Sequence, residues 1–385
     1  MNKELLYKNL SSIVLYENVA NCVVLSNLKK YLLNSTIENY CCFISSLYKE
    51  GCDLGEFLEK SLMSDDNVYV RSFAAGDLIP LVMEECFKRE LSIFSSFTQI
   101  NPQSIGIDGE NLPLFLNTPK DFLKIIPEAL KNSSKQGYGI YAKYGMFRVN
   151  NKGALIPILS PDKISLSSLV GYEEERKQVL DNTIGLLNGK PSANILLCGD
   201  AGTGKSSTVK AVANHLFKEG IRLIEIQKDQ LKLLPDILGE IAHNPLKFIL
   251  FVDDLSFAPD EQGFGTLKAI LEGSAAAKTN NAVIYATSNR RHIIKETFSA
   301  RAGDEVHLND TLQETLSLSA RFGLTVLFSK PNKELYLKIV RTLADNNGIE
   351  VSKELDISAE AFALSKGGRS ARTAEQFINN YITNH

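Results

Sequence analysis

The sequence predicts an α/β fold, in which a five-stranded parallel sheet covered by helices follows a mainly helical N-terminal domain and precedes a helical C-terminal lid. Three observations lead to this prediction. Apolar runs of strand length alternate with helical patterns between residues 169 and 328, which is the rhythm of a parallel sheet with helices on both faces. Apolar residues recur at spacings of three and four before residue 100, as in amphipathic helices. Helical patterns return after Pro331.

The elements are expected in the following order. Helical spacing covers residues 22–48 and 78–91, a loop rich in Gly, Pro and Asn covers 101–113, and a short helix covers 120–126. Two short apolar runs around the turn Asn150–Gly153 predict a β-hairpin. Strands are expected at 194–198, 221–226, 247–252, 282–287 and 324–328, and helices at 334–344, 358–365 and 371–382.

These elements predict four parts of the chain. We expect a mainly helical domain over residues 1–135, a hairpin and linker over 136–165, an α/β core over 166–330 and a helical lid over 331–385. No chemical motif falls in the N-terminal part.

Composition is that of a globular protein with a sizeable core. Of the 385 residues, 44% are hydrophobic and 23% are charged, and the net charge of −3 gives no global reason to expect a nucleic acid or a membrane as partner. The six cysteines lie mostly in apolar stretches without a C-x-x-C pair, which excludes a disulfide framework or zinc site and indicates reduced thiols in a cytoplasmic protein. We expect neither a signal peptide nor a membrane span.

The stretch Gly199–Ser207 is the centre of the α/β part. It matches G-x-x-x-x-G-K-[ST], and it lies between a strand pattern and a helical pattern, the context that this phosphate-binding motif needs. Such a turn directs successive backbone N–H groups and the positive end of a helix dipole at one point. We therefore expect the ATP phosphates to bind the whole segment, namely Gly199, Asp200, Ala201, Gly202, Thr203, Gly204, Lys205, Ser206 and Ser207.

Two side chains of this segment have individual roles in the prediction. Lys205 is expected to reach the β- and γ-phosphates, and the Ser206 hydroxyl is expected to bind Mg²⁺.

Asp253 and Asp254 follow the strand at 247–252. Because ligands bind at the carboxyl ends of parallel strands, Asp253 is the expected second ligand of the metal and Asp254 the expected base for the attacking water.

Polar residues elsewhere complete the candidate site. Asn289 follows the strand at 282–287 and is expected to hold the water or touch the γ-phosphate, with Thr287 and Ser288 as alternatives. Arg321 precedes the last strand, and Arg372 begins the last helix, which Ser370 can cap. An arginine near the γ-phosphate stabilises charge in the transition state.

In this order, the two phosphate-site motifs, the polar strand-end residue and the two arginines resemble the AAA+ ATPases over roughly residues 160–385. The segments 248–257, 267–273 and 284–292 are similar to a bacterial AAA+ family catalogued as domain of unknown function 815. The resemblance implies a P-loop NTPase sheet of strand order 5-1-4-3-2 and a ring or partial ring of subunits.

The resemblance also implies roles for single residues. Asn289 would be sensor 1, Arg321 the finger that reaches a neighbour's ATP, and Arg372 sensor 2, with Arg369 as the alternative. Val170 and Gly171 fall where these proteins pack around adenine. Asp254 stands where most of them have Glu, and no aromatic-Gly pore loop follows the second strand, so Gly263–Gly265 is the candidate segment for gripping a partner.

Three functions follow from these features. The first is an ATP-hydrolysing AAA+ protein that remodels a protein or a protein–nucleic-acid complex. The second is an ATP-switched DNA loader or initiator, favoured by the basic cluster of Arg290, Arg291, His292 and Lys295. The third, a small-molecule phosphotransferase, is disfavoured by the lid and by Arg321, because a kinase needs no finger from a neighbouring subunit.

Overall fold

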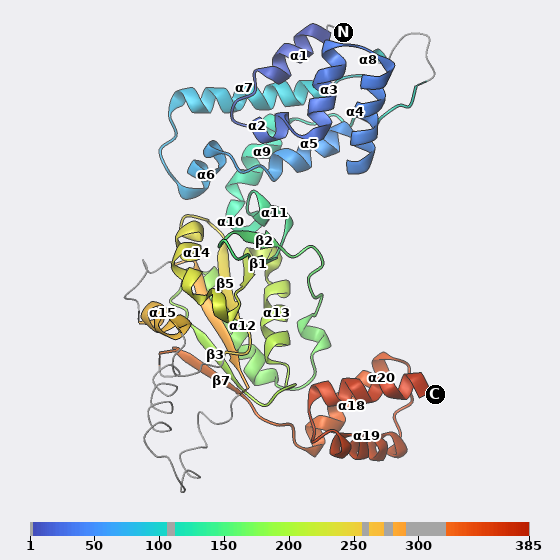
Figure 1. Ribbon diagram of the computed structural model, residues 1–385, viewed down its shortest axis with the longest axis vertical. Coiled ribbons are helices and arrows are strands. Elements are labelled where there is room, and N and C mark those ends of the chain that lie inside the picture. The colour runs from blue at the N-terminus through green and yellow to red at the C-terminus, as the bar shows by residue number, and fades with distance from the viewer. Residues whose placement is uncertain (1–2, 106–111, 256–261, 273–279, 290–320, 385) are drawn as a thin grey trace. The chain divides into compact units, whose positions relative to one another are not determined.

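The computed structural model of the chain describes residues 3–105, 112–255, 262–272, 280–289 and 321–384. The chain divides into two compact units (Figure 1). The first comprises residues 1–144 with 243–246, and the second comprises 145–242 with 247–385.

The described residues of the first unit are mainly helical. Its helices are α1 (Lys3–Ser11), α2 (Glu17–Ala20), α3 (Val23–Leu33), α4 (Ile37–Glu50), α5 (Leu54–Met63), α6 (Val68–Ala75), α7 (Leu81–Thr98), α8 (Pro102–Ile105), α9 (Phe122–Lys131), α10 (Ser133–Gln136) and α11 (Ile140–Lys143). The helix expected at 78–91 begins later, at Leu81, because Pro80 occupies its N-cap position. It extends to Thr98, and its apolar face joins one buried core with α1, α3, α4 and α5.

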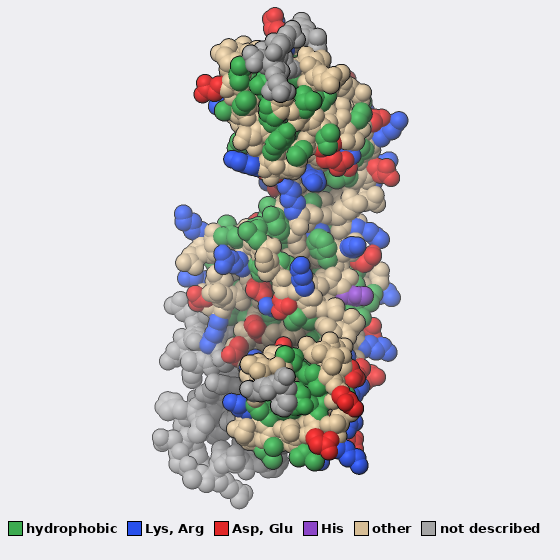
Figure 2. Space-filling view, turned by 90° about the vertical axis from the view of Figure 1, so that its right-hand side faces the viewer, with side chains coloured by type: hydrophobic (Ala, Val, Ile, Leu, Met, Phe, Trp, Pro, Cys, Tyr) green, Lys and Arg blue, Asp and Glu red, His purple; other side chains and the backbone are tan. Residues whose placement is uncertain are grey.

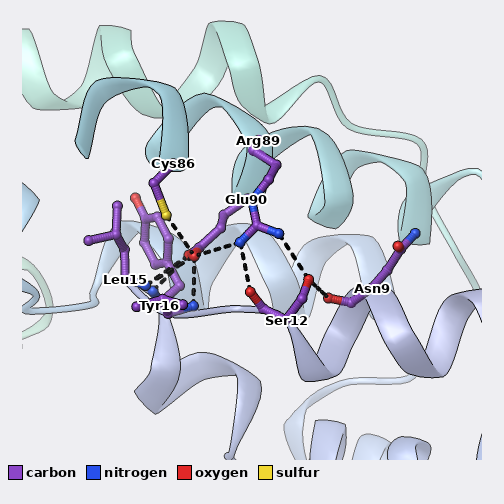
Figure 3. Close-up of polar contacts among 8 residues, drawn as sticks. Asn9, Ser12, Leu15, Tyr16, Cys86, Arg89 and Glu90 are labelled. Atoms are coloured by element: carbon purple, nitrogen blue, oxygen red, sulfur yellow. Dashed lines mark hydrogen bonds and ion pairs between the residues drawn. The ribbon is translucent and has the colours of Figure 1, made fainter. Parts of the chain in front are cut away.

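A buried carboxylate ties the start of this unit to α7 (Figure 3). Glu90 is 0% exposed, and its two oxygens accept hydrogen bonds from the backbone N–H groups of Val14, Leu15 and Tyr16. The Cys86 thiol donates to the same carboxylate over 3.3 Å, and Arg89 forms an ion pair with it over 3.5 Å. Glu90 therefore provides hydrogen-bond acceptors for the backbone N–H groups of the turn between α1 and α2, which forms few helical hydrogen bonds of its own.

The second unit contains the sheet and the helices around it. In chain order its elements are β1 (Met146–Val149), β2 (Leu155–Pro157), the 3₁₀ turn η1 (Leu166–Ser168), α12 (Glu173–Leu187), β3 (Ile195–Gly199), α13 (Lys205–His215), η2 (Phe217–Glu219), β4 (Ile221–Glu225), η3 (Lys228–Leu233), α14 (Leu234–Ile241), β5 (Lys247–Val252), α15 (Gln262–Leu271), β6 (Ala282–Ser288), β7 (Leu324–Phe328), α18 (Lys333–Asn346), α19 (Lys353–Ser365) and α20 (Ala371–Asn384). The five strands expected after residue 190 are all present.

The sheet of the described residues has seven strands, in the order β2-β1-β4-β5-β6-β3-β7. The prediction of five strands was wrong in number, because the expected hairpin of β1 and β2 joins the sheet. Its two strands are antiparallel to each other, and β1 then pairs with β4 in parallel. The remaining strands pair in parallel, so their carboxyl ends meet at one edge.

Buried apolar side chains fix the helices to this sheet. The strands β3 to β6 are almost wholly buried, as expected of a parallel sheet covered on both faces. One face packs against α12 and α13 through Val179, Leu186, Val209 and Val212. Figure 1 shows α13 on one side of the sheet and α14 and α15 on the other.

Helices α18, α19 and α20 follow β7 and enclose a core of their own, which includes Tyr336, Val340, Leu355, Ala359 and Phe377. Helix α19 begins at Lys353, earlier than expected, because the Ser352 hydroxyl accepts from the backbone N–H of Leu355 and caps it. The cap expected at the last helix is confirmed, since Ser370 accepts from the backbone N–H of Thr373.

Among the described residues, no helix is both long and apolar enough to span a bilayer. Two predictions fall outside them. These are the basic cluster at 290–295 and the side chain of Phe264 in the candidate gripping segment.

Candidate functional site

The phosphate-loop segment connects β3 to α13 by a turn that requires glycine. At Gly199 the backbone of β7 passes so close that a Cβ atom would lie 1.9 Å from the carbonyl oxygen of Phe328. At Gly204, φ is +91° and the residue caps α13, a left-handed conformation that side chains disfavour. The turn therefore brings the start of α13 and its first backbone N–H groups to the carboxyl edge of the sheet.

Lys205 is the first residue of α13 and is only 5% exposed. Its ammonium donates to the carbonyl oxygens of Gly199 and Asp200 over 2.9 and 2.7 Å. Burial lowers the pKa of Lys205, and the negative charges of Asp200, Asp253 and Asp254 partly oppose this shift. The positive charge is thus held at the loop without a direct carboxylate partner among the hydrogen bonds of the described residues.

Two carboxylates follow β5 at the same edge. Asp253 accepts from the Ser206 hydroxyl over 2.6 Å and from the Thr287 hydroxyl over 2.5 Å. Asp254 has a φ of +53°, rare for a residue with a side chain, and accepts from the Asn289 amide over 2.9 Å. The structure therefore brings the ends of β5 and β6 together with the start of α13.

The donors at this point suit magnesium. The Ser206 hydroxyl and the Asp253 carboxylate lie within hydrogen-bonding distance of each other, and hydroxyl and carboxylate oxygens are the ligands that Mg²⁺ uses in proteins, together with water and phosphate oxygens. The residues present therefore fit the metal that the sequence predicts.

A cavity of about 850 Å³ opens over these groups, within the size range of small-molecule sites. Most of the predicted site residues line it, namely Val170, Ala201, Gly202, Thr203, Gly204, Lys205, Ser206, Ser207, Asp253, Asp254, Asn289 and Arg372. Gly199, Asp200 and Gly171 do not line it. Gly199 and Asp200 instead hold Lys205, and Gly171 lies against Leu335.

The three candidate arginines differ in position. Arg372 lines the cavity, and its backbone N–H donates to the Gly202 carbonyl over 3.2 Å. Arg369 lies outside the cavity lining and makes two hydrogen bonds to Glu360, of 2.9 and 2.6 Å, which raise the pKa of the guanidinium. Arg321 pairs with Glu272 and does not line the cavity either. The geometry thus favours Arg372 over Arg369 for contact with a nucleotide.

Sequence reasoning missed one wall of the cavity. The expected linker contributes Asp162 and Ile164, and Ser168 just after it also lines the cavity. The Asn214 amide on α13 holds the linker there, because it donates to the carbonyls of Asp162 and Ile164 over 2.8 and 2.9 Å. Arg176 on α12 lines the cavity as well, and burial lowers the pKa of its guanidinium. No signal in the sequence marks these residues, since they come from segments without a motif.

Further lining residues that sequence reasoning missed come from the C-terminal helices. Ile339, Leu343 and Asn346 on α18 line the cavity, as do Ala371 and Glu375 on α20. The first three are spaced along one side of α18. Ile339 and Leu343 could be recognised from the sequence as part of an apolar helix face. The sequence pattern alone, however, assigns an apolar helix face to the core between helices and not to a ligand cavity.

Part of the chain is similar to known proteins. A family model described as "Protein of unknown function (DUF815)" matches residues 142–385. The chain is 25% identical over 215 residues to the chaperone protein ClpB of Rickettsia bellii and equally to that of Rickettsia felis, a match that covers 48% of this chain and 23% of each relative. It thus spans about a quarter of the length of these relatives.

Among solved structures, the chain is similar to AMPPCP-bound DnaA from Aquifex aeolicus. The TM-score is 0.38 and the identity 19%, over 57% of this chain and 64% of that one.

Proposed function

Since this chain belongs to the DUF815 family and is related to the AAA+ ATPases, we propose that it binds ATP with Mg²⁺ and hydrolyses it to ADP and phosphate. One observation carries the proposal. A single cavity is lined by Lys205, Ser206, Asp253, Asp254 and Asn289, the set of cation, metal-ligand and water-orienting groups that phosphoryl transfer requires.

Lys205 provides the positive charge for the triphosphate. Its ammonium is bonded to two loop carbonyls. These neutral acceptors can be exchanged for phosphate oxygens, which form stronger, charge-assisted hydrogen bonds. The backbone N–H groups at the start of α13 would bind the same phosphates.

Ser206 and Asp253 would hold the metal between them. Bound Mg²⁺ supplies neutralisation of the charge on the β- and γ-phosphates. The serine hydroxyl donates to the carboxylate, so the two oxygens lie close enough together to bind one metal ion.

Asp254 would accept the proton of the attacking water. Its carboxylate lies in the cavity lining and is oriented by the Asn289 amide, which is the arrangement of a general base and its orienting partner. Asn289 would also hold the water itself or contact the γ-phosphate.

The surrounding fold supports the same proposal. The parallel strands run β7-β3-β6-β5-β4 across the sheet, which in chain order of those five strands is 5-1-4-3-2, the order that the resemblance implies. We assign residues 166–330 as the ATPase core and 331–385 as its lid, with Val170 at the adenine end and Arg372 as sensor 2. Residues 1–135 and 136–165 remain assigned as the N-terminal domain and the hairpin and linker.

We also propose that the protein works as a homo-oligomer, in a ring or partial ring, and remodels a protein or protein–nucleic-acid partner. Arg321 lies outside the cavity of its own subunit, as a finger that serves a neighbour's site would. The similarity to a chaperone over 215 residues favours a protein partner.

The alternative is a DNA loader or initiator switched by ATP. Figure 2 shows acidic and basic side chains interspersed over the face in view, and the basic cluster that favours this function lies outside the described residues. DNA binding that falls steeply with salt would support it, and absence of binding at about 50 mM salt would remove it.

The proposed activity is tested with Asp254→Asn. This variant keeps the shape of the side chain and its contact with Asn289 but is no longer a base, so we expect ATP to bind and hydrolysis to fall by about 10²- to 10⁴-fold. ATP binding is measured by calorimetry and phosphate release by a coupled assay. An unchanged rate would place the base elsewhere.

A further inference from the structure

One threonine hydroxyl contacts both aspartates of the site, the side chain of Asp253 and the backbone of Asp254. The Thr287 hydroxyl donates to the Asp253 carboxylate over 2.5 Å and accepts from the backbone N–H of Asp254 over 2.9 Å. A hydroxyl has one proton to donate, so these two bonds fix its orientation. Thr287 is 2% exposed and therefore has little water to exchange with.

The position of Thr287 in the sheet explains these contacts. It follows Ala286, which pairs with Val252 of β5, and it pairs with Leu197 of β3 on the other side. Thr287 thus lies between the strand that ends in the carboxylates and the strand that enters the phosphate loop. Its carbonyl also accepts from the backbone N–H of Leu255 over 2.6 Å, so backbone and side chain together hold the turn that follows β5.

That turn needs a restraint. Asp254 has a left-handed backbone, a conformation that persists in residues with a side chain only when the surroundings impose it. The Thr287 hydroxyl bonds the N–H of this very residue. Without it, Asp254 loses one of the contacts that hold its backbone, and Asp253 loses a donor that orients its carboxylate.

We infer that Thr287 is a positioning residue of the site, which holds Asp253 toward the metal and Asp254 toward the attacking water through a single hydroxyl. The inference rests on the proposed ATPase function and adds a residue to it. It assigns to Thr287 a task separate from that of Asn289, because Thr287 acts on both aspartates while Asn289 contacts the Asp254 carboxylate alone among the hydrogen bonds of the described residues.

Loss of the Thr287 hydroxyl should affect ATP binding without metal differently from the Mg²⁺-dependent steps. Phosphate binding by the loop and Lys205 does not involve Thr287, so ATP affinity in EDTA should be unchanged in Thr287→Val. The gain in affinity on adding Mg²⁺ should shrink and kcat should fall by about 10- to 100-fold, the usual effect of removing a group that orients metal ligands. Thr287→Ser keeps the hydroxyl and should restore both.

A matched control comes from Thr183 on α12. Thr183 is fully buried, its hydroxyl bonds the Val179 carbonyl and the Tyr285 hydroxyl, and it does not line the cavity. Thr183→Val thus removes an equally buried hydroxyl from the same unit. We expect it to lower the thermal midpoint and to leave kcat and the effect of Mg²⁺ as in the wild type.

The experiment compares the full-length wild type with these variants, using ATP as ligand and substrate. Wild-type kcat and Mg²⁺ response in Thr287→Val would overturn the inference, as would equal losses in Thr183→Val or no rescue in Thr287→Ser. If Thr287→Val does not fold, Thr287→Cys replaces it, because a thiol is a weak donor, and it must fall below Thr287→Ser. A wild type that binds no ATP would instead refute the proposed function, and the inference with it.

Discussion

Lys205 illustrates how burial sets the chemistry of one residue. Its ammonium lies among loop carbonyls, and burial lowers its pKa from 10.5. Bound phosphates would stabilise the charged form and raise the pKa again. At a pH between the pKa of Lys205 without ATP and its pKa with ATP bound, the protein takes up a proton when ATP binds. The affinity for ATP therefore falls as the pH rises.

We therefore expect ATP affinity to be constant below the lowered pKa of free Lys205 and to fall above it by up to about tenfold per pH unit. Calorimetry of ATP binding from neutral to alkaline pH, in two buffers with different heats of ionisation, measures both the affinity and the proton uptake. Affinity that does not change with pH, without proton uptake, would contradict this account of Lys205.

Cys198 precedes the phosphate loop on β3 and is 4% exposed. Burial raises its pKa to about 11, so its thiol stays protonated at neutral pH and reacts slowly. We expect iodoacetamide to modify the exposed Cys42 and Cys52 in the native protein and to reach Cys198 only after unfolding. Mass spectrometry of the labelled peptides would contradict this if Cys198 reacted as fast as Cys52.

At the scale of elements, Glu90 of α7 holds the turn between α1 and α2. Its carboxylate accepts hydrogen bonds from three successive backbone N–H groups, those of Val14, Leu15 and Tyr16 (Figure 3). Both carboxylate oxygens are acceptors, whereas a glutamine side chain at this position would replace one of them with an NH₂ donor. The turn therefore depends on one buried side chain that lies 74 or more residues away in sequence.

Glu90→Gln should destabilise the first unit by about 1–3 kcal/mol, the effect of leaving buried donors without acceptors. Hydrogen exchange of the amides of residues 14–16 should accelerate, which locates the effect. Glu4→Gln is the control, because Glu4 is exposed and its partner Lys8 lies one turn away, and it should leave exchange unchanged. Equal exchange in Glu90→Gln and wild type would contradict the role of Glu90.

Elements differ in how far the sequence predicts them. The strands at 194–198 and 247–252 could be predicted because each is a short apolar run with a polar motif at its end. The joining of the β1–β2 hairpin to the sheet could not, because pairing with β4 depends on which edge is free, and no local pattern encodes that. The missed lining residues have the same cause, since segments as distant in sequence as those of Arg176 and Asn346 line one cavity only in the folded chain.

The choice between Arg369 and Arg372 also depended on tertiary contacts. Both lie at the start of the last helix in sequence, but Glu360 of α19 holds Arg369 away from the cavity lining. By contrast, the phosphate-loop residues could be predicted from the sequence because they form one continuous segment. Asp253, Asp254 and Asn289 could be predicted as well, because ligands bind at the carboxyl ends of parallel strands.

At the scale of the whole molecule, the proposal requires neighbouring subunits. Arg321→Ala should lose ATPase activity, because the finger is missing from every shared site. Mixing it with Asp254→Asn subunits should restore part of the activity, since some sites then combine an intact Asp254 with an intact Arg321. The measurement is phosphate release by mixtures whose co-assembly is shown by light scattering. No rescue in co-assembled mixtures would argue against shared sites.

The central claim is that the cavity at the carboxyl edge of the sheet binds the triphosphate of ATP. Calorimetric titration of the wild type and of Lys205→Ala with ATP and Mg²⁺ tests it most directly, with circular dichroism to show that both are folded. We predict saturable binding at one site per chain in the wild type and none in Lys205→Ala. Equal ATP affinity in the two proteins would contradict the claim.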